Sequence, residues 1–466
     1  MRFGGKATTV VFELTLYDDV TSALVIDLVV LLFCTILLLR YGRLAHSHPA
    51  VIYLFFHVIV ISSRLLAIMA GAETLFSKWG GFYEPVTEAE LARATILADI
   101  VLIVMTIACI RASQVDLKRI NTKPEESAAT ATTLSLRHIW TVVGIAFPVG
   151  VIGVALVSNV PGFEKPDVDF GEWQESSWLS ITTTWAGLSL LALIYWYGFR
   201  LWLVAPMVVY LFIMSVQGFH RFRAVIPLIL LLQIYLDRRQ KKWPPSYVTA
   251  LIFAAMLLFY PMKSIGRMAQ EGATVNEISE SSTEILREVA AGQNGDQTLL
   301  DQFASSLTLI DRAEKFYYGS TYLALLTSPI PRQFWPEKPG LADYQKDFST
   351  PSRPMSEMGM TVTFMGEFYL NFGNVGVVIM SFLTAYWLAR IYFRGYRSSY
   401  YSVLRFSYLL IACNLIQVYR DGLMSLFVFT LVNMMPLSII VFLHLVRPLR
   451  ARPEAVPLYG LPLSPK

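Results

Sequence analysis

The chain has 466 residues, of which 55% are hydrophobic and only 15% are charged, and its formal net charge at pH 7 is +4. One soluble core could not enclose that share of apolar residues, so the composition excludes an ordinary soluble protein and predicts an integral membrane protein. The small net charge gives no reason to expect a nucleic-acid partner. The three cysteines lie in separate apolar segments, without the spacing of a metal site or a disulfide framework.

Apolar segments follow one another along the whole chain, each long enough for a helix to cross roughly 30 Å of hydrocarbon. Lipid offers the backbone no hydrogen-bond partner, so each segment should be helical. The sequence therefore predicts an all-α polytopic membrane protein with about eleven transmembrane helices. The expected spans are 21–39, 50–70, 94–110, 139–157, 178–197, 201–216, 224–237, 246–262, 371–390, 402–419 and 422–446.

Basic residues gather in alternate loops between these segments. They are Arg40 and Arg43; Arg111, Lys118, Arg119, Lys123 and Arg137; Arg238, Arg239, Lys241 and Lys242; Arg390, Arg394 and Arg397; and Arg447, Arg450 and Arg452. The positive-inside rule makes these loops cytoplasmic, which places the N-terminus and the longest loop on the outer side.

The longest loop divides the chain into three parts. We expect an N-terminal transmembrane bundle at 1–262, a large outer loop at 263–370, and C-terminal transmembrane helices with a cytoplasmic tail at 371–466. The residues at 281–284 fit a capping box, and 298–318 carry apolar side chains at helical spacing. The loop should therefore be folded, with at least two amphipathic helices that pack on the spans or lie in the interface.

Three ionisable residues, Asp27, Arg64 and Asp99, are expected at one depth in the first three spans. A lone charge there costs several kcal/mol, so we expect these three residues to pair with one another. Alternatively, Arg64 faces an outward-opening cavity and binds an anionic group. His57 stands alone on an apolar span and is expected to be a satisfied core residue rather than a proton carrier.

The short outer turn at 217–223 carries His220, Arg221 and Arg223, on the side where the positive-inside rule disfavours cations. A guanidinium is planar and permanently charged, which suits phosphate. We therefore expect phosphate binding at this turn, with lipid-headgroup anchoring as the alternative. Arg420 at the next outer turn is a weaker case, because Asp421 can pair with it.

The end of the outer loop combines cations, carboxylates and aromatic side chains. Sugars favour this mixture, because aromatic rings stack on their apolar faces while carboxylates and arginines bond their hydroxyls. In chain order the residues are Asp311, Arg312, Glu314, Lys315, Tyr317 and Tyr318, then Arg332 and Lys338, then Gly366, Glu367, Tyr369 and Asn371. We expect the chemistry where this region enters the next apolar segment.

The order of these features resembles the O-antigen (oligosaccharide repeat-unit) polymerases of the Wzy type. Members are similar in their many spans, a large outer loop in the second half, an IPR…KP segment, and a GE-Y-NFG-x-x-G run entering a span. Here the run is Gly366, Glu367, Tyr369, Asn371, Phe372, Gly373 and Gly376. The Arg420-Asp421-Gly422 turn is similar to the RGD or RGS turn common in the family.

The resemblance implies a glycosyltransferase with a GT-C-like fold that needs no metal or cofactor. It would lie in the bacterial inner membrane, with its active site facing the periplasm. Similar enzymes move a growing glycan from one undecaprenyl diphosphate carrier to the sugar of another carrier-linked repeat unit. The implied partners are undecaprenyl-diphosphate-linked oligosaccharide, membrane lipid and a chain-length regulator protein, and Arg312 and Arg332 would hold diphosphate groups.

A physical mechanism follows as a hypothesis. Arg221, Arg223 and Arg64 bind the donor diphosphate and stabilise its charge as the bond to the anomeric carbon breaks. Glu367 is the general base for the acceptor hydroxyl, with Asp311 and Glu314 in reserve. Alternatively, Glu367 only ties the loop to the span through backbone hydrogen bonds. The further residues expected to bind substrate are His220, Asp311, Arg312, Tyr318, Arg332, Lys338, Tyr369, Asn371 and Arg420.

Three rival functions remain at this point. An O-antigen ligase would use the same donor and usually carries a histidine in the large outer loop, where this chain has none. A transporter of the lipid-linked oligosaccharide predicts inverted repeats, and the sequence shows no internal repeat. A non-catalytic scaffold would use the loop to dock a partner.

Overall fold

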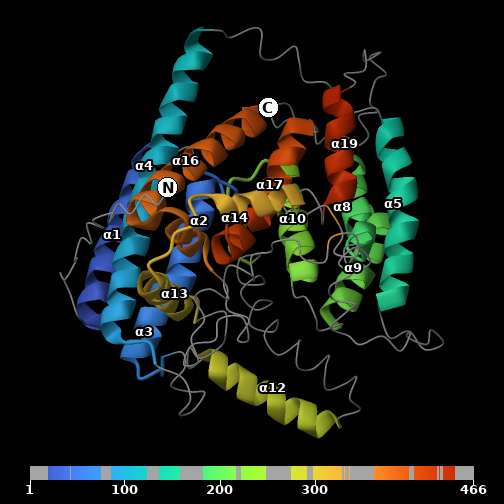
Figure 1. The fold of residues 1–466 in the computed structure, drawn as a ribbon. Coiled ribbons are helices and arrows are strands. Elements are labelled where there is room, and N and C mark those ends of the chain that lie inside the picture. Colours follow the sequence, from blue (N-terminus) through green and yellow to red (C-terminus); the bar gives the residue numbers. More distant parts are fainter. Residues whose placement is uncertain are drawn as a thin grey trace.

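The structure is a computed structural model that describes eleven ranges and three single residues of the chain. They are 19–41, 44–74, 85–122, 136–157, 182–216, 222–247, 274–290, 298–327, 362–397, 403–427 and 434–446, with 330, 335 and 430. Throughout these residues the regular secondary structure is helical and there is no strand. The predicted all-α architecture is confirmed. Figure 1 shows α1, α4, α13 and α16 on one side of the molecule and α5, α8, α9 and α19 on the other.

The N-terminal helices are α1 (Val20–Tyr41), α2 (Pro49–His57), η1 (Val58–Ser62), α3 (Ser63–Met69) and α4 (Glu88–Thr122). The π-helical turn η1 joins α2 to α3, so that the three form one apolar stretch from Pro49 to Met69. The His48 side chain caps α2 by accepting the Ala50 N–H at 3.2 Å. Buried apolar side chains of α2, η1 and α4 form one core cluster with α13 and α16.

A second core cluster lies among α5 (Leu136–Val157), α8 (Trp185–Tyr197), α9 (Leu201–Val216) and α10 (Phe222–Arg238). The C-terminal helices are α16 (Phe364–Arg397), α17 (Val403–Asp421), α18 (Leu423–Phe427) and α19 (Met435–Val446). Gly373 interrupts α16 with φ of +63°, a conformation that favours glycine. Because α17 packs on α10 and on α16, it joins the two halves of the bundle.

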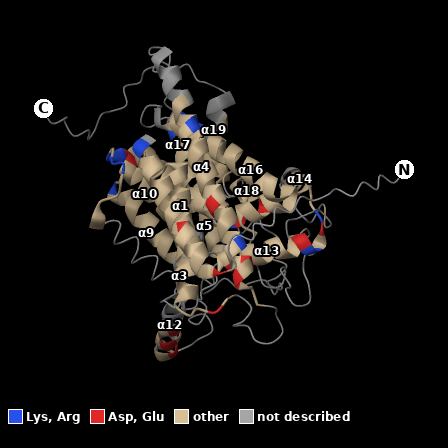
Figure 2. Cartoon of the chain, turned by 90° about the vertical axis from the view of Figure 1, so that its left-hand side faces the viewer, with Lys and Arg blue, Asp and Glu red and all other residues tan. Residues whose placement is uncertain are grey.

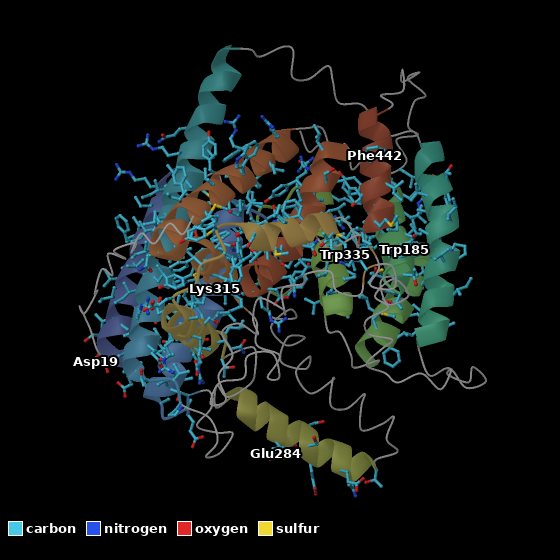
Figure 3. All side chains as sticks on the ribbon, in the orientation of Figure 1. Asp19, Trp185, Glu284, Lys315, Trp335 and Phe442 are labelled. Carbon is cyan, nitrogen blue, oxygen red and sulfur yellow. The ribbon has the colours of Figure 1, made fainter. Side chains whose placement is uncertain are left out.

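The outer loop contains helices α12 (Val275–Ala290), α13 (Leu299–Ala313) and α14 (Ser320–Thr327), which confirms that it is folded. The capping box was predicted at the wrong place, because 281–284 lies inside α12. The helix is capped instead by Thr274 and Glu277, whose side chains each accept the other's backbone N–H. Glu284 on α12 points away from the bundle (Figure 3).

Helix α13 is part of the bundle rather than a surface helix. Its residues from Leu299 to Ile310 are buried except at Thr308, and it packs on α4, α16 and η1. The interfacial alternative is therefore wrong for this helix. Its insertion places residues of the expected loop against η1 and α4 of the N-terminal part and against α16 of the C-terminal part.

Four helical stretches of the described chain are long and apolar enough to cross a membrane: Val20–Arg40, Pro49–Met69, Glu88–Gln114 and Phe364–Gly395. Three shorter apolar stretches are Ile139–Ala155, Trp185–Tyr197 and Leu201–Met214. The expected span at 246–262 lies almost entirely outside the described residues. In Figure 2, Lys and Arg gather mainly beside α10 and α17, whereas Asp and Glu gather mainly around α12 and α13.

Candidate functional site

Glu367 lies in the first turn of α16 and is only 1% exposed. One carboxylate oxygen, Oε2, accepts the backbone N–H of Met424 at 3.4 Å, at the start of α18. Within the described chain the other oxygen, Oε1, has no hydrogen-bond partner. The carboxylate also lies directly against Gly422, where φ is +100°. The two sequence motifs, Gly366-Glu367 and Arg420-Asp421-Gly422, therefore meet in space.

The side chain of Tyr322, on α14, lies beside the Glu367 carboxylate. Its hydroxyl faces Glu367, although no hydrogen bond of standard geometry joins the two groups. Burial and then the Glu367 charge raise the pKa of Tyr322, so the hydroxyl stays protonated and able to donate. A buried acid with one uncommitted oxygen and a hydroxyl donor beside it can accept a proton from a third group.

Asn371 lies one helical turn after Glu367 and is fully buried. Its Nδ2 donates to the Glu367 backbone oxygen at 2.8 Å, and its Oδ1 accepts from Gly319 N–H at 2.9 Å and Thr321 Oγ1 at 3.0 Å. Its backbone oxygen accepts the Tyr318 N–H at 2.9 Å. These bonds occupy both ends of the amide and fix the chain before α14 to α16, while substrate binding by Asn371 stays a prediction.

A polar triangle joins α4, α13 and α16. Arg93 donates from Nη1 to Asp311 Oδ2 at 2.6 Å and from Nη2 to the Tyr369 hydroxyl at 2.8 Å. Tyr369 donates in turn to Asp311 Oδ1 at 2.5 Å. The Arg93 and Asp311 side chains are 37% and 40% exposed. The sequence singled out Asp311 and Tyr369, and the structure brings them together around Arg93, which no sequence motif marks.

Arg64 is not part of the expected ion triad. It is 1% exposed and donates from Nε and Nη2 to Asp301 at 2.8 and 2.7 Å, and also from Nη2 to the Glu73 backbone oxygen at 2.7 Å. The partner carboxylate belongs to the inserted helix α13, which sequence spacing could not place beside α3. This bidentate pair ties α13 to the bundle. Arg64 is thus buried against Asp301, where an outward-opening cavity had been the alternative expectation.

Asp27 and Asp99 pair with His57 instead. His57 Nε2 lies 2.7 Å from Asp27 Oδ1 and 3.3 Å from Asp99 Oδ1, and all three side chains are buried. His57 is thus a paired core residue, as expected, but its partners had been assigned to Arg64. Their ligand atoms lie within 4.8 Å of one another, so this trio has the donor set and spacing for a metal ion.

The remaining predicted residues divide into two groups. Arg312 and Tyr318 are exposed, and Arg420 is partly buried with Nη1 3.5 Å from Asp421 Oδ1, so the expected self-pairing is observed. Residues His220, Arg221, Arg332 and Lys338 lie outside the described residues. Arg223 is in the first turn of α10, but its side chain is also outside them. The phosphate-binding turn therefore stays a prediction.

Arg93 and Tyr322 are functional candidates that the sequence reasoning did not name. Arg93 carried a usable signal, because it is a cation close to the outer end of a span, the same feature that singled out Arg221 and Arg223. Tyr322 carried none, because it is one tyrosine of many in an aromatic loop. Only the fold shows that α14 turns back to Glu367.

The comparison with known families decides the identity. The family model of the O-antigen polysaccharide polymerase Wzy matches residues 7–449, nearly the whole chain. The chain belongs to the Wzy family. Among curated proteins and among solved structures, no match is found.

Membership makes this Wzy-family chain a multi-pass membrane protein with a polysaccharide polymerase role. The sequence resemblance is therefore confirmed at the level of the family. It also gives the Glu367 and Gly422 contact a functional setting, because both residues lie in the matched region.

Proposed function

We propose that the protein polymerises undecaprenyl-diphosphate-linked oligosaccharide repeat units at the periplasmic face of the bacterial inner membrane. The growing glycan leaves its carrier and joins the sugar of a second carrier-linked unit. The observation that carries this proposal is the buried Glu367 carboxylate, held at one oxygen by Met424 and uncommitted at the other within the described chain.

Glu367 Oε1 is the proposed general base. It takes the proton of the acceptor hydroxyl while that oxygen forms a bond to the donor's anomeric carbon. The bond from the anomeric carbon to the phosphate oxygen breaks, and undecaprenyl diphosphate leaves with the bonding electrons. Met424 fixes Oε2, so the carboxylate keeps its orientation, while the Tyr322 hydroxyl can donate to its ionised form before the proton is transferred.

The leaving diphosphate needs positive charge near this acid. Arg93 and Arg420 are the described candidates, because each belongs to an element that contacts the Glu367 region and each is partly exposed. Arg221, Arg223, Arg312 and Arg332 complete the proposed cation set, with His220 and Lys338 beside them. Such preorganised cations stabilise developing charge without a metal ion. Arg64 is left out, because it is fully buried as well as paired with Asp301, whereas Arg93 and Arg420 keep exposed surface.

Charge placement supports the proposed membrane orientation. The Lys and Arg residues beside α10 and α17 lie at one end of the bundle, and the acidic α12 and α13 region lies at the other (Figure 2). The positive-inside rule makes the first end cytoplasmic, so the loop region with Glu367 faces outward. About eleven spans, a GT-C-like arrangement and a chain-length regulator partner belong to the same proposal.

The deciding experiment incubates the purified protein with a synthetic undecaprenyl-diphosphate repeat unit in the presence of EDTA. We expect a ladder of glycans that lengthens by one repeat unit per step. Glu367→Gln should abolish the ladder, whereas Glu284→Gln, at an exposed residue of the same loop, should keep it. Transfer of single sugars without a ladder, or no transfer at all, would contradict the proposed polymerase.

A further inference from the structure

The turn between α13 and α14 presents an exposed aromatic ring in an unfavourable backbone conformation. Lys315, labelled in Figure 3, stands just before this turn. Tyr318 is 77% exposed and has φ of +48°, a backbone angle that residues other than glycine rarely adopt. Strain of this kind persists only where the surroundings enforce it, and it clusters at functional sites.

Hydrogen bonds to α16 hold Tyr318 in this backbone conformation. Backbone N–H groups of Tyr317 and Tyr318 donate to the backbone oxygens of Leu370 and Asn371 at 3.2 and 2.9 Å. The next N–H, of Gly319, donates to the Asn371 side chain at 2.9 Å. Three consecutive amides are thus fixed to the helix turn that follows Glu367.

The Phe316 ring contacts two tyrosine rings, one in this turn and one on α16. The Phe316 ring meets Tyr318 edge-on at 6.4 Å between centroids and meets Tyr369 in the same way at 6.1 Å. The Phe316 ring also packs on α16 at Gly373, where a Cβ would lie 3.4 Å from it, in ordinary contact. The Phe316 ring therefore contacts the Tyr318 ring at one edge, and most of the Tyr318 surface is uncovered.

We propose that Tyr318 is a sugar-stacking subsite that binds a pyranose ring of the acceptor oligosaccharide, with Asn371 as its positioning residue. This inference rests on the proposed function. A backbone that is fixed before binding loses no further conformational freedom when a sugar covers the ring, so more of the stacking contribution reaches affinity. The Asn371 bond to the Glu367 backbone fixes the platform relative to the proposed base.

The test measures the apparent KM for the acceptor with the donor saturating. Tyr318→Ala should raise this KM about fivefold and leave kcat within about twofold, since stacking contributes about 1 kcal/mol. Tyr318→Phe should keep the wild-type KM because the ring is retained. Tyr247→Ala, at a tyrosine that is 67% exposed beyond α10, is the matched control and should change nothing.

A glycine variant separates binding from structure. Tyr318→Gly removes both the ring and the backbone strain, so it should raise the unfolding temperature while raising the acceptor KM. An unchanged KM in the alanine and glycine variants would overturn the platform. So would a KM that rises in Tyr318→Phe, because a ring anchored at the lipid headgroups needs its hydroxyl.

Direct binding keeps the two proposals distinguishable. Saturation-transfer NMR with the free, lipid-less repeat-unit oligosaccharide should show binding to the wild type and a loss of signal in Tyr318→Ala. If the oligosaccharide binds in a Tyr318-dependent way but no glycan ladder forms, the polymerase proposal is contradicted and the subsite is supported. If a ladder forms and binding is the same with and without the Tyr318 ring, the subsite is contradicted and the polymerase is supported.

Discussion

The carboxylate of Glu367 occupies the space in which a side chain on Gly422 would lie. Gly422 has φ of +100° and follows the last residue of α17, so it both ends that helix and admits the acid. This contact joins the two motifs, which the helical hairpin of α16 and α17 separates in the sequence.

Gly422→Ala should therefore displace the acid as well as strain the backbone. Gly71 provides the matched control, because it has φ of +96° and nothing within 4 Å of an added Cβ. Both variants should lose about 1 kcal/mol or more of stability from the positive φ. Only Gly422→Ala should also lose activity, by more than about tenfold, because a displaced catalytic group loses its alignment. Equal activities of the two variants would show that the contact has no catalytic importance.

Glu367→Gln tests the acid itself. The amide keeps an oxygen for the Met424 N–H, so the fold is expected to survive, with an unfolding temperature close to that of the wild type. Loss of a general base lowers turnover by about 10²- to 10⁴-fold. Steady-state rates with the lipid-linked repeat unit measure this. Turnover reduced in Asp311→Asn but retained in Glu367→Gln would move the role of base to Asp311.

The transmembrane character and the folded outer loop could be predicted because both follow from local patterns. Apolar runs of spanning length indicate helices whatever their neighbours are. Residue pairing could not be predicted in the same way. Asp27, Arg64 and Asp99 were grouped by their expected depth. In the structure, helix α13 places Asp301 beside Arg64, and Asp27 and Asp99 pair with His57. Depth limits which residues can meet, and only packing decides which do.

The Arg64 and Asp301 pair should be a large structural contribution. Removing one partner leaves a buried charge uncompensated, so Arg64→Met or Asp301→Leu alone should destabilise the protein by about 3–5 kcal/mol. The double variant should recover most of the loss, because two apolar side chains replace two charges. Arg420→Met is the control at a partly exposed pair and should cost about 1 kcal/mol or less. Thermal unfolding in detergent measures all four variants, and a double variant as unstable as the singles would refute this account.

His57 should hold two carboxylates together in the bundle. Without its imidazole, Asp27 and Asp99 face each other in the buried core, where like charges repel and are poorly solvated. His57→Leu should therefore lower the unfolding temperature by several degrees, and adding Asp99→Asn should restore part of it. A double variant less stable than His57→Leu would show that Asp99 has a separate favourable partner. Metal analysis of the purified wild type tests whether the trio holds an ion.

The site was predictable only where a motif names its residues. Glu367, Asn371 and the Arg420-Asp421-Gly422 turn stood out in the sequence, but the role of Asn371 did not. A buried amide and a substrate-binding amide look alike in a sequence. The hydrogen bonds of Asn371 to Gly319, Thr321 and Glu367 show that it holds the chain before α14.

Arg93 is the cation whose contribution is most open to measurement. Its planar guanidinium donates one hydrogen bond to Asp311 and one to Tyr369. Lysine keeps the positive charge but cannot reproduce this geometry. Hydrogen bonds to charged groups contribute about 1.5–3 kcal/mol, so Arg93→Lys should lower kcat/KM by about tenfold or more. Tyr369→Phe removes one bond to each partner and should lower it less. Arg239→Lys is the control, at an exposed arginine just after α10 that has no part in the proposed site. If Arg239→Lys lowers kcat/KM as far as Arg93→Lys does, the loss is a general effect of replacing arginine and the triangle has no special part in it.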